Sequence, residues 1–291
     1  MTLRNLPGRV LLFALLFAVA PRLIALNPEW TKPFPPHRIA GNLYYVGSED
    51  LASYLIVTPE GNILINSSLE NSVPLIRRSI RALGFKFSDT KILLISHAHY
   101  DHCAGSETIK KLTGARYFVM DADVPVVESG GKMDFQYGAD PIEHYPAAKV
   151  DRVLHDGDTV RLGGVVLTAH KTAGHTRGTT TWTMDLPMHG KMLHVVIVGS
   201  PNVNPGYKLV GNERYPQISE DYKHGFEVLK SLPCDIFLGA HGGYYDMTQK
   251  YARMKKGEAN VFIDPDGYEG YIADRQQAFE AELARQLAAK Q

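Results

Sequence analysis

The chain has 291 residues with 31 basic and 31 acidic side chains, so its formal net charge is zero. A neutral chain lacks the excess of positive charge that nucleic-acid-binding proteins carry, and we therefore exclude nucleic acid as its main partner. The hydrophobic content of 44% and the charged content of 21% are ordinary for a globular protein that is long enough to bury a core.

The first 25 residues have the layout of a secretory signal peptide. A basic start precedes an eleven-residue apolar run at 10–20, and small residues follow up to Ala25. The run is shorter than the roughly 20 apolar residues that span a bilayer, so we favour a cleaved signal over the alternative of an uncleaved anchor. We expect 1–25 to be removed, 26–291 to form one domain, and the mature protein to lie in the periplasm without stable membrane association.

The predicted elements alternate between strands and helices along both halves of the chain. Apolar and alternating runs predict strands, in chain order, at 43–46, 53–57, 62–66, 91–95, 117–120, 153–154, 165–168, 179–184, 193–198 and 235–239. Helical spacing predicts helices at 73–83, 104–112, 122–129, 219–232, 247–256 and 276–290. A Pro-rich extended arm is expected at 30–36 and a long surface loop at 130–146. This order predicts an α/β protein with two packed sheets and helices outside them.

The stretch from His97 to His102 lies directly after the fourth predicted strand. It places three imidazoles and one carboxylate, those of His97, His99, Asp101 and His102, within six residues, and both groups are good zinc ligands. His97 and His99 are two apart, so in extended geometry both can reach one ion, whereas Asp101 and His102 can serve a second. A structural zinc site would use several Cys residues, so the stretch predicts an open, catalytic metal site.

Two later histidines can complete the ligand shells, because each zinc ion takes about four ligands. His175 and His241 both lie in glycine-flanked turns, and His241 comes straight after a predicted strand. Glycine lets the backbone approach an ion closely. His170 remains an alternative ligand or a packed histidine. Cys103 follows the cluster and is either a soft ligand or a buried free thiol, and the sequence leaves its pairing with Cys234 open.

The motifs H-x-H-x-D-H at 97–102 and G-H-T at 174–176, with the strand-end His241, resemble the metallo-β-lactamase superfamily. The resemblance covers nearly the whole chain beyond about residue 27 and implies a four-layer αβ/βα sandwich, with two mixed sheets and helices on the outer faces. It also implies two zinc ions per chain, the first held by His97, His99 and His175 and the second by Asp101, His102 and His241.

One departure from the superfamily pattern bears on the substrate. Many of its hydrolases carry a bridging Asp after the strand at 193–198, but here Ser200 stands in that place and no acid follows up to Tyr207. This difference favours the true β-lactamases, and the two ligand sets resemble their third subclass. Further stretches that resemble this subclass are 47–51, 205–209, 212–216 and 232–235.

The resemblance implies that the chain hydrolyses penicillins, cephalosporins and carbapenems through a zinc-bound hydroxide and confers antibiotic resistance. A lactonase or thioester hydrolase of the same superfamily is the alternative. Asp101 is the expected catalytic residue, because it can orient the hydroxide as well as bind the second zinc. The only partner expected is a small β-lactam substrate, and the protein is expected to be a monomer.

The resemblance also suggests residues that contact the substrate. Ser200 and Asn202 are candidates for binding its carboxylate, with Asn204 as a further one, and Phe135 and Gln136 lie at lid positions in the 130–146 loop. The alternative for the first three is an ordinary polar turn, and for Phe135 it is local packing.

Overall fold

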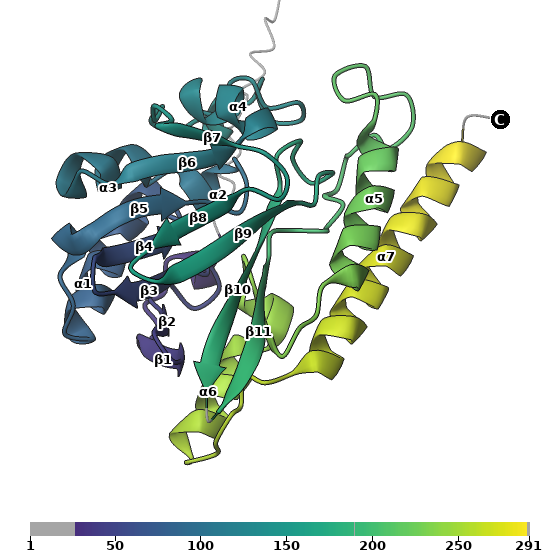
Figure 1. Ribbon diagram of the computed structural model, residues 1–291. Coiled ribbons are helices and arrows are strands. Elements are labelled where there is room, and N and C mark those ends of the chain that lie inside the picture. Colours follow the sequence, from purple (N-terminus) through teal and green to yellow (C-terminus); the bar gives the residue numbers. More distant parts are fainter. Residues whose placement is uncertain (1–26, 189, 290–291) are drawn as a thin grey trace, which may run out of the picture.

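The computed structural model describes residues 27–188 and 190–289, and the predicted signal peptide at 1–25 lies outside them. Within the described residues a seven-stranded and a five-stranded sheet pack together (Figure 1). The first sheet contains, in spatial order, β1 (His37–Ala40), β2 (Leu43–Tyr45), β3 (Tyr54–Thr58), β4 (Gly61–Ile65), β5 (Thr90–Leu94), β6 (Arg116–Met120) and β7 (Arg152–Leu154). The second contains β12 (Ile236–Gly239), β11 (Lys191–Val198), β10 (Thr180–Met188), β9 (Val165–Lys171) and β8 (Thr159–Leu162).

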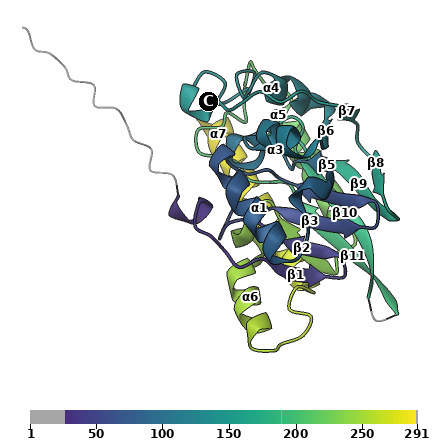
Figure 2. The same ribbon diagram turned by 90° about the vertical axis from the view of Figure 1, so that its left-hand side faces the viewer.

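Helices flank the two sheets. Figure 2 shows α1 and α3 in front of the first sheet, and Figure 1 shows α5 and α7 beyond the second. The α-helices are α1 (Val73–Ala82), α2 (Tyr100–Cys103), α3 (Ser106–Thr113), α4 (Val124–Glu128), α5 (Ile218–Ser231), α6 (Met247–Lys255) and α7 (Pro265–Ala288). Short 3-10 helices are η1 (Pro28–Trp30), η2 (Glu70–Ser72), η3 (Phe87–Asp89), η4 (Asp121–Asp123), η5 (Pro141–Glu143) and η6 (Gly242–Tyr245).

Both sheets are mixed. In the first, β1 to β4 are antiparallel neighbours, and β4 to β7 are parallel. In the second, β8 to β11 are antiparallel and β12 pairs parallel to β11. The predicted four-layer sandwich of two mixed sheets with helices outside is therefore confirmed.

Both faces of the first sheet are buried, and alternate side chains of its strands pack on opposite faces. In β4, Ile63 and Ile65 join the core that also holds Trp182 of β10, so they face the second sheet. Leu64 lies between them and packs in a separate cluster with Ile76 of α1. Successive side chains of a strand point to opposite faces, so continuous apolar strands are buried on both sides.

Backbone hydrogen bonds tie the two sheets together at one edge. The amide of Thr180, at the start of β10, donates to the carbonyl of Ser96 after β5 at 2.7 Å. The amide of Ala52 donates to the carbonyl of Ala240 after β12 at 3.0 Å. All three predicted metal-binding segments, at 97–102, at His175 and at His241, begin within five residues of these cross-connections. The edge where the sheets meet thus gathers distant parts of the sequence.

The observed elements differ from the predicted ones in four places, one of which is the short helix α2, which precedes the predicted start at 104. Strands β1 and β8 were not predicted, and α7 begins at Pro265, well before the predicted start at 276. The thiols of Cys103, which is buried, and Cys234, which is half-buried, are both free. None of the described helices combines the length and the apolar character that crossing a membrane requires.

Candidate metal centre

The segment after β5 is extended up to His99 and helical from Tyr100 onward. His99 has extended dihedral angles (φ −84°, ψ 151°) and precedes α2, so it and His97 share one side of the chain. Asp101 and His102 lie in the first turn of α2. Asn66, at the end of β4, accepts a hydrogen bond at 2.8 Å from the amide of Ser96 and so fixes the start of the segment.

His175 lies in the turn between β9 and β10, where its orientation is set by backbone groups. Its Nδ1–H donates to the carbonyl of Asn202 at 2.8 Å, which leaves Nε2 with a free lone pair. The preceding Gly174 has φ +135°, and a Cβ there would lie 2.6 Å from the ring of Tyr222. Only glycine fits this approach, so the turn requires the glycine that precedes His175.

His241 is oriented by a carboxylate from the other sheet. Its Nδ1–H donates to Asp50 Oδ2 at 2.8 Å, so Nε2 again carries the free lone pair. Asp50 also accepts from the indole N–H of Trp30 at 3.2 Å and from the amide of Gly243 at 3.1 Å. A carboxylate behind a metal-binding imidazole fixes its tautomer and raises its basicity.

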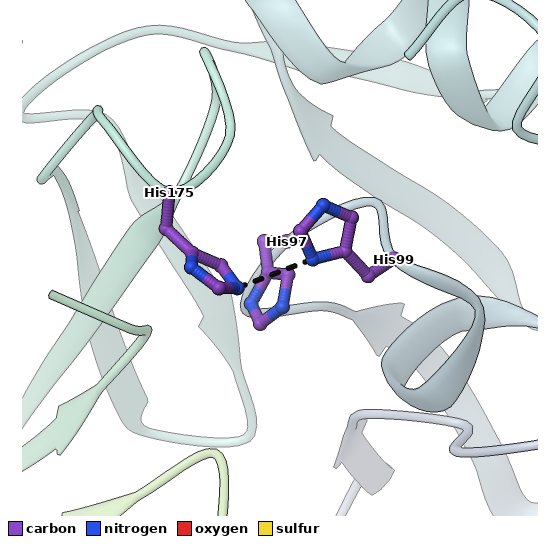
Figure 3. Close-up of side chains that lie close together, drawn as sticks. All are labelled: His97, His99 and His175. Atoms are coloured by element: carbon purple, nitrogen blue, oxygen red, sulfur yellow. Dashed lines mark hydrogen bonds between the residues drawn. The ribbon is translucent and has the colours of Figure 1, made fainter. Parts of the chain in front are cut away.

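The six side chains gather into two triads. In the first, drawn in Figure 3, His99 Nδ1 lies 3.1 Å from His175 Nε2, and His97 has a ring nitrogen within 4.8 Å of both. In the second, Asp101 Oδ2 lies 3.1 Å from His102 Nε2 and 3.6 Å from His241 Nε2, and those two nitrogens are 3.1 Å apart. Ligand atoms about 2.1 Å from a tetrahedral zinc ion lie roughly 3.4 Å from one another, which the second triad and the His99–His175 pair match. His97 has a ring nitrogen within 4.8 Å of the ligand atoms of His99 and His175 and also of Asp101 and His102.

The electrostatics of the buried triads favour a cation. Burial lowers the pKa of His97 and of His175 well below the ordinary imidazole value, and neighbouring imidazoles lower it further, so both rings are neutral ligands. His97 Nε2 is buried and makes no hydrogen bond among the described residues. A buried lone pair without a partner is costly, and a metal ion would satisfy it.

The pKa shifts of Asp101 and His241 have opposite signs, because each group stabilises the charge of the other. Burial would raise the pKa of Asp101, but His102 and His241 outweigh burial and hold that pKa well below its usual range. Burial would lower the pKa of His241, but Asp50 and Asp101 raise it above its ordinary value. An ionised carboxylate beside an imidazole that attracts positive charge is a suitable pair of ligands for a divalent cation.

Two further buried carboxylates support the metal-binding loops. Asp123 Oδ2 accepts from the amide of Ala98 at 2.9 Å and from the hydroxyl of Thr176 at 2.8 Å, and its Oδ1 accepts from the amide of Gly178 at 2.9 Å. One side chain therefore joins the loop that carries His97 and His99 to the turn that carries His175.

Asp134 is the second of these carboxylates. Its Oδ1 accepts from the amides of Gln136 and Tyr137, and its Oδ2 lies 3.7 Å from His99 Nε2. It places a negative charge behind His99 and at the same time fixes the fold of the surrounding loop.

A cavity of about 520 Å³ opens above the triads. Its walls include four of the six ligand residues, with aromatic and amide side chains around them. The other lining residues are Trp30, Asp50, Tyr100, Tyr137, Glu143, Asn202, Asn204, Gly243 and Tyr244. Such a cavity can hold a small molecule with its reacting bond against the metal centre.

The predicted substrate residues occupy different places relative to this cavity. Asn202 lines it, and its amide donates to Tyr244 Oη at 2.7 Å. Ser200 is buried behind Tyr244, with 3.2 Å between the two hydroxyl oxygens, and does not line the cavity. Phe135 is buried against the rings of two tyrosines, and Gln136 also lies outside the lining.

Sequence reasoning missed several residues that shape the site. Tyr100 lies inside the His-rich motif and Tyr244 follows His241 closely, so their proximity to the ligands was a usable signal. Asp50, Asp123 and Asp134 lie in separate segments, and no local pattern in the sequence marks them as partners of the ligands. His170, the alternative ligand, instead bonds with Thr183 through its Nε2 at 2.9 Å.

Known proteins resemble the chain in both sequence and fold. The sequence profile of the Metallo-beta-lactamase superfamily matches residues 51–186. The chain is 62% identical to the native FEZ-1 metallo-β-lactamase from Legionella gormanii, with a TM-score of 0.87 over 88% of this chain and 98% of that one. It is 37% identical to BJP-1, a subclass B3 metallo-β-lactamase of Bradyrhizobium japonicum, with a TM-score of 0.85 over 91% and 99% of the two chains.

Similarity to curated sequences is more local. The chain is 30% identical over 105 residues to a probable metallo-hydrolase from Burkholderia pseudomallei. That alignment covers 36% of this chain and 34% of the relative, so it spans about a third of the relative's length.

Proposed function

The chain belongs to the metallo-β-lactamase family, and we propose that it is a zinc-dependent β-lactamase that opens the cyclic amide of β-lactam antibiotics. The similarity to FEZ-1 and to the subclass B3 enzyme BJP-1 extends over nearly the whole length of both. This agrees with the resemblance to the third subclass that the sequence motifs carry.

We propose two zinc ions per chain, one in each triad. His97, His99 and His175 would hold the first, and Asp101, His102 and His241 the second; the spacing and the unpartnered His97 Nε2 support this. When bound, the ions supply a nucleophilic water at neutral pH and polarise the amide carbonyl.

The residues of the chain position the reacting groups. Asp101 stays ionised, and because its Oδ2 faces His102 and His241, we assign its Oδ1 the role of accepting a hydrogen bond from the attacking water. The carbonyl of Asn202 and the carboxylate of Asp50 hold His175 and His241 in the tautomers that keep each Nε2 free. No side chain of the protein needs to bond covalently to the substrate.

The proposed substrate class rests on the residue two positions after the end of β11, which is a serine and not a carboxylate. A second carboxylate at that point would favour the other hydrolases of the superfamily, but Ser200 stands there and its hydroxyl is 3.2 Å from that of Tyr244. Asp101 is the only carboxylate within the two triads of the described residues. Ser200 therefore supports the β-lactamase over the lactonase.

The position of each predicted substrate residue relative to the cavity suggests its role. Asn202 faces the cavity and is proposed to bind the substrate carboxylate, with Asn204 beside it. Ser200 accepts a hydrogen bond from the Asn202 amide at 3.3 Å and lies 3.2 Å from Tyr244 Oη, so we propose that it positions both, whereas Phe135 and Gln136 lie behind the surface of the cavity.

The test is hydrolysis by the purified, zinc-loaded protein. We expect turnover of a penicillin, a cephalosporin and a carbapenem, loss of turnover with a chelator, and recovery with zinc. A lactone and a thioester are assayed beside them. If the protein leaves all three antibiotics intact and cleaves the lactone or the thioester, the proposed function is wrong.

We further propose, from the sequence pattern at 1–25, that the chain is exported to the periplasm, confers resistance there and acts as a monomer. Fractionation of cells that express the full chain should find the shortened protein in the periplasm, and those cells should survive a β-lactam. Accumulation of the full-length chain in the cytoplasm would contradict this proposal.

A further inference from the structure

The charged side chains that line the cavity are all acidic or imidazole groups. No Lys or Arg of the described residues is among them, whereas Asp50, Asp101 and Glu143 are. Asp101 is a proposed metal ligand, and Asp50 accepts hydrogen bonds from Trp30, His241 and Gly243. Glu143 remains as the one cavity carboxylate that the metal centre does not use.

The Glu143 carboxylate has no partner of its own. Among the described residues it makes no side-chain hydrogen bond and no ion pair, in contrast to Asp50 and Asp101. It is half-buried, and burial together with the negative charges of Asp101, Asp140 and Asp134 raises its pKa to about 7. These facts describe a carboxylate without a compensating positive charge.

The surrounding loop holds Glu143 in place. On one side Asp140 Oδ1 accepts from the amide of Ile142 at 3.0 Å. On the other, the ring Nε2–H of His144 donates to the carbonyl of Gly138 at 3.0 Å, and Tyr145 Oη donates to the carbonyl of Ala98 at 2.7 Å. Ala98 lies between His97 and His99, so the loop that carries Glu143 is fixed to the metal-binding segment itself.

Two tyrosines of the cavity, Tyr100 and Tyr137, feel the negative charge of Glu143. Burial raises the pKa of Tyr100 and of Tyr137, and the charge of Glu143 adds to the rise in both. Both tyrosines line the cavity, so Glu143 shares a wall with them. All three side chains therefore line the same cavity as four of the six proposed metal ligands.

We propose that Glu143 makes the enzyme prefer β-lactams that carry a positively charged group outside the fused ring system. This inference rests on the proposed β-lactamase function. A cationic substituent would form an ion pair with Glu143, while the ring carboxylate stays at Asn202 and the reacting amide at the metal centre. The contact lies away from the reacting bond, so it stabilises the bound substrate and the transition state alike and changes KM rather than kcat.

The experiment compares matched substrates on Glu143→Gln, which keeps the size of the side chain and removes its charge. One pair is a penicillin whose phenylacetyl arm carries an aminomethyl group, and the same compound with that amine acetylated. A second pair places a primary amine and its acetylated form on the other arm of a carbapenem. At about pH 8.5 such amines are protonated and a carboxyl with a pKa of about 7 is ionised.

We expect the wild type to bind the amine form of at least one pair with a KM about fivefold below that of the acetylated form. Glu143→Gln should abolish this difference by raising the KM of the amine form, with kcat and the acetylated substrate unchanged. Glu60→Gln, an exposed carboxylate in the β3–β4 turn, is the matched control and should behave as the wild type.

Equal amine preference in the wild type and in Glu143→Gln, for both pairs, would overturn the inference. So would a wild type without any preference. Either result leaves the proposed function standing, because the acetylated substrates are still hydrolysed. If the wild type hydrolyses none of the four compounds, it is the β-lactamase proposal that fails.

Discussion

Asp101 contributes the single carboxylate of the two triads among the described residues, and its Oδ2 is within 3.6 Å of both His102 Nε2 and His241 Nε2. We expect Asp101→Ala to lose the second metal ion and to lower kcat by at least about a hundredfold, because a developing charge loses its stabilising cation. Zinc content and kcat measure the two effects.

Asp185→Ala is the matched control for that variant. Asp185 is exposed in β10 and pairs with His194 at 2.8 Å. It should keep full zinc content and full activity. An unchanged kcat in Asp101→Ala would show that the assignment of the second triad is wrong.

Asp123 is a positioning residue, because it accepts three hydrogen bonds from the two loops that carry the first triad. Asp123→Asn keeps the shape of the side chain but replaces one accepting oxygen by an NH₂ group, which would face a backbone N–H or the Thr176 hydroxyl. We expect about ten- to a hundredfold weaker binding of zinc at the first triad, as for other groups that orient metal ligands. Chelator competition and the visible spectrum of the Co²⁺-loaded protein report this.

Asp264→Asn separates this effect from simple destabilisation. Asp264 forms an ion pair with Lys250 at 2.6 Å and caps the start of α7. Its variant should unfold more easily and still bind metal like the wild type. If Asp123→Asn keeps wild-type affinity and a wild-type Co²⁺ spectrum, Asp123 does not position the ligands.

The ligands were open to prediction from the sequence, whereas the groups that orient them were not. The spacing of His97 to His102 and the glycines around His175 are local patterns. Asp50 meets His241 only because a strand of one sheet adjoins the end of a strand in the other, at the bridge between Leu51 and His241. Such pairing depends on the tertiary fold, which no local spacing encodes.

At the scale of the elements, strands with apolar runs were predicted and strands with mixed composition were missed. β8 reads Thr-Val-Arg-Leu and buries only Val160, so it lacks the apolar signal. α7 was predicted too short because Gly267 and Gly270 weaken its helical pattern. Its true start has a capping signal, since the Asp264 side chain accepts from the amide of Gly267 and Pro265 follows it.

The packing of α7 on α5 connects stability to the metal centre. Phe279 is buried, and its ring stacks on Tyr222 with 5.2 Å between centroids. Tyr222 Oη donates to the carbonyl of Asn202, which also accepts from His175. Phe279→Ala should therefore lower the free energy of unfolding by about 3–5 kcal/mol and weaken zinc binding to a smaller extent.

Denaturant unfolding measures the first effect and chelator competition the second. Leu287→Ala on the same helix is the control, because Leu287 is 50% exposed and its loss should change stability little. A fully stable Phe279→Ala protein would mean that α7 does not secure α5 against the second sheet.

At the scale of the whole molecule, the sandwich brings its ligands together from segments that are far apart in sequence. His37 lies away from the metal centre, so its titration changes the stability of the fold without involving the metal ligands. Its ring is buried, with Tyr45 and Phe262 stacked beside it, and its Nδ1–H donates to the carbonyl of Pro35 at 2.9 Å. Burial lowers its pKa to about 4.

In the unfolded chain His37 has an ordinary pKa of about 6.5, so between pH 6.5 and 4 the unfolded state binds more protons than the folded one. The stability that the neutral ring contributes is thus fully present above pH 6.5 and is lost as the pH falls toward 4. The loss is on the order of 3 kcal/mol. His37→Phe keeps an aromatic ring and removes the titration.

We therefore expect the unfolding free energy of zinc-free His37→Phe to fall less steeply between pH 6.5 and 4 than that of the zinc-free wild type. The metal-binding histidines titrate in both proteins, so the difference between the two slopes isolates His37. Denaturant unfolding at several pH values gives both slopes. Parallel curves would mean that His37 takes up its proton without unfolding the aromatic cluster around it.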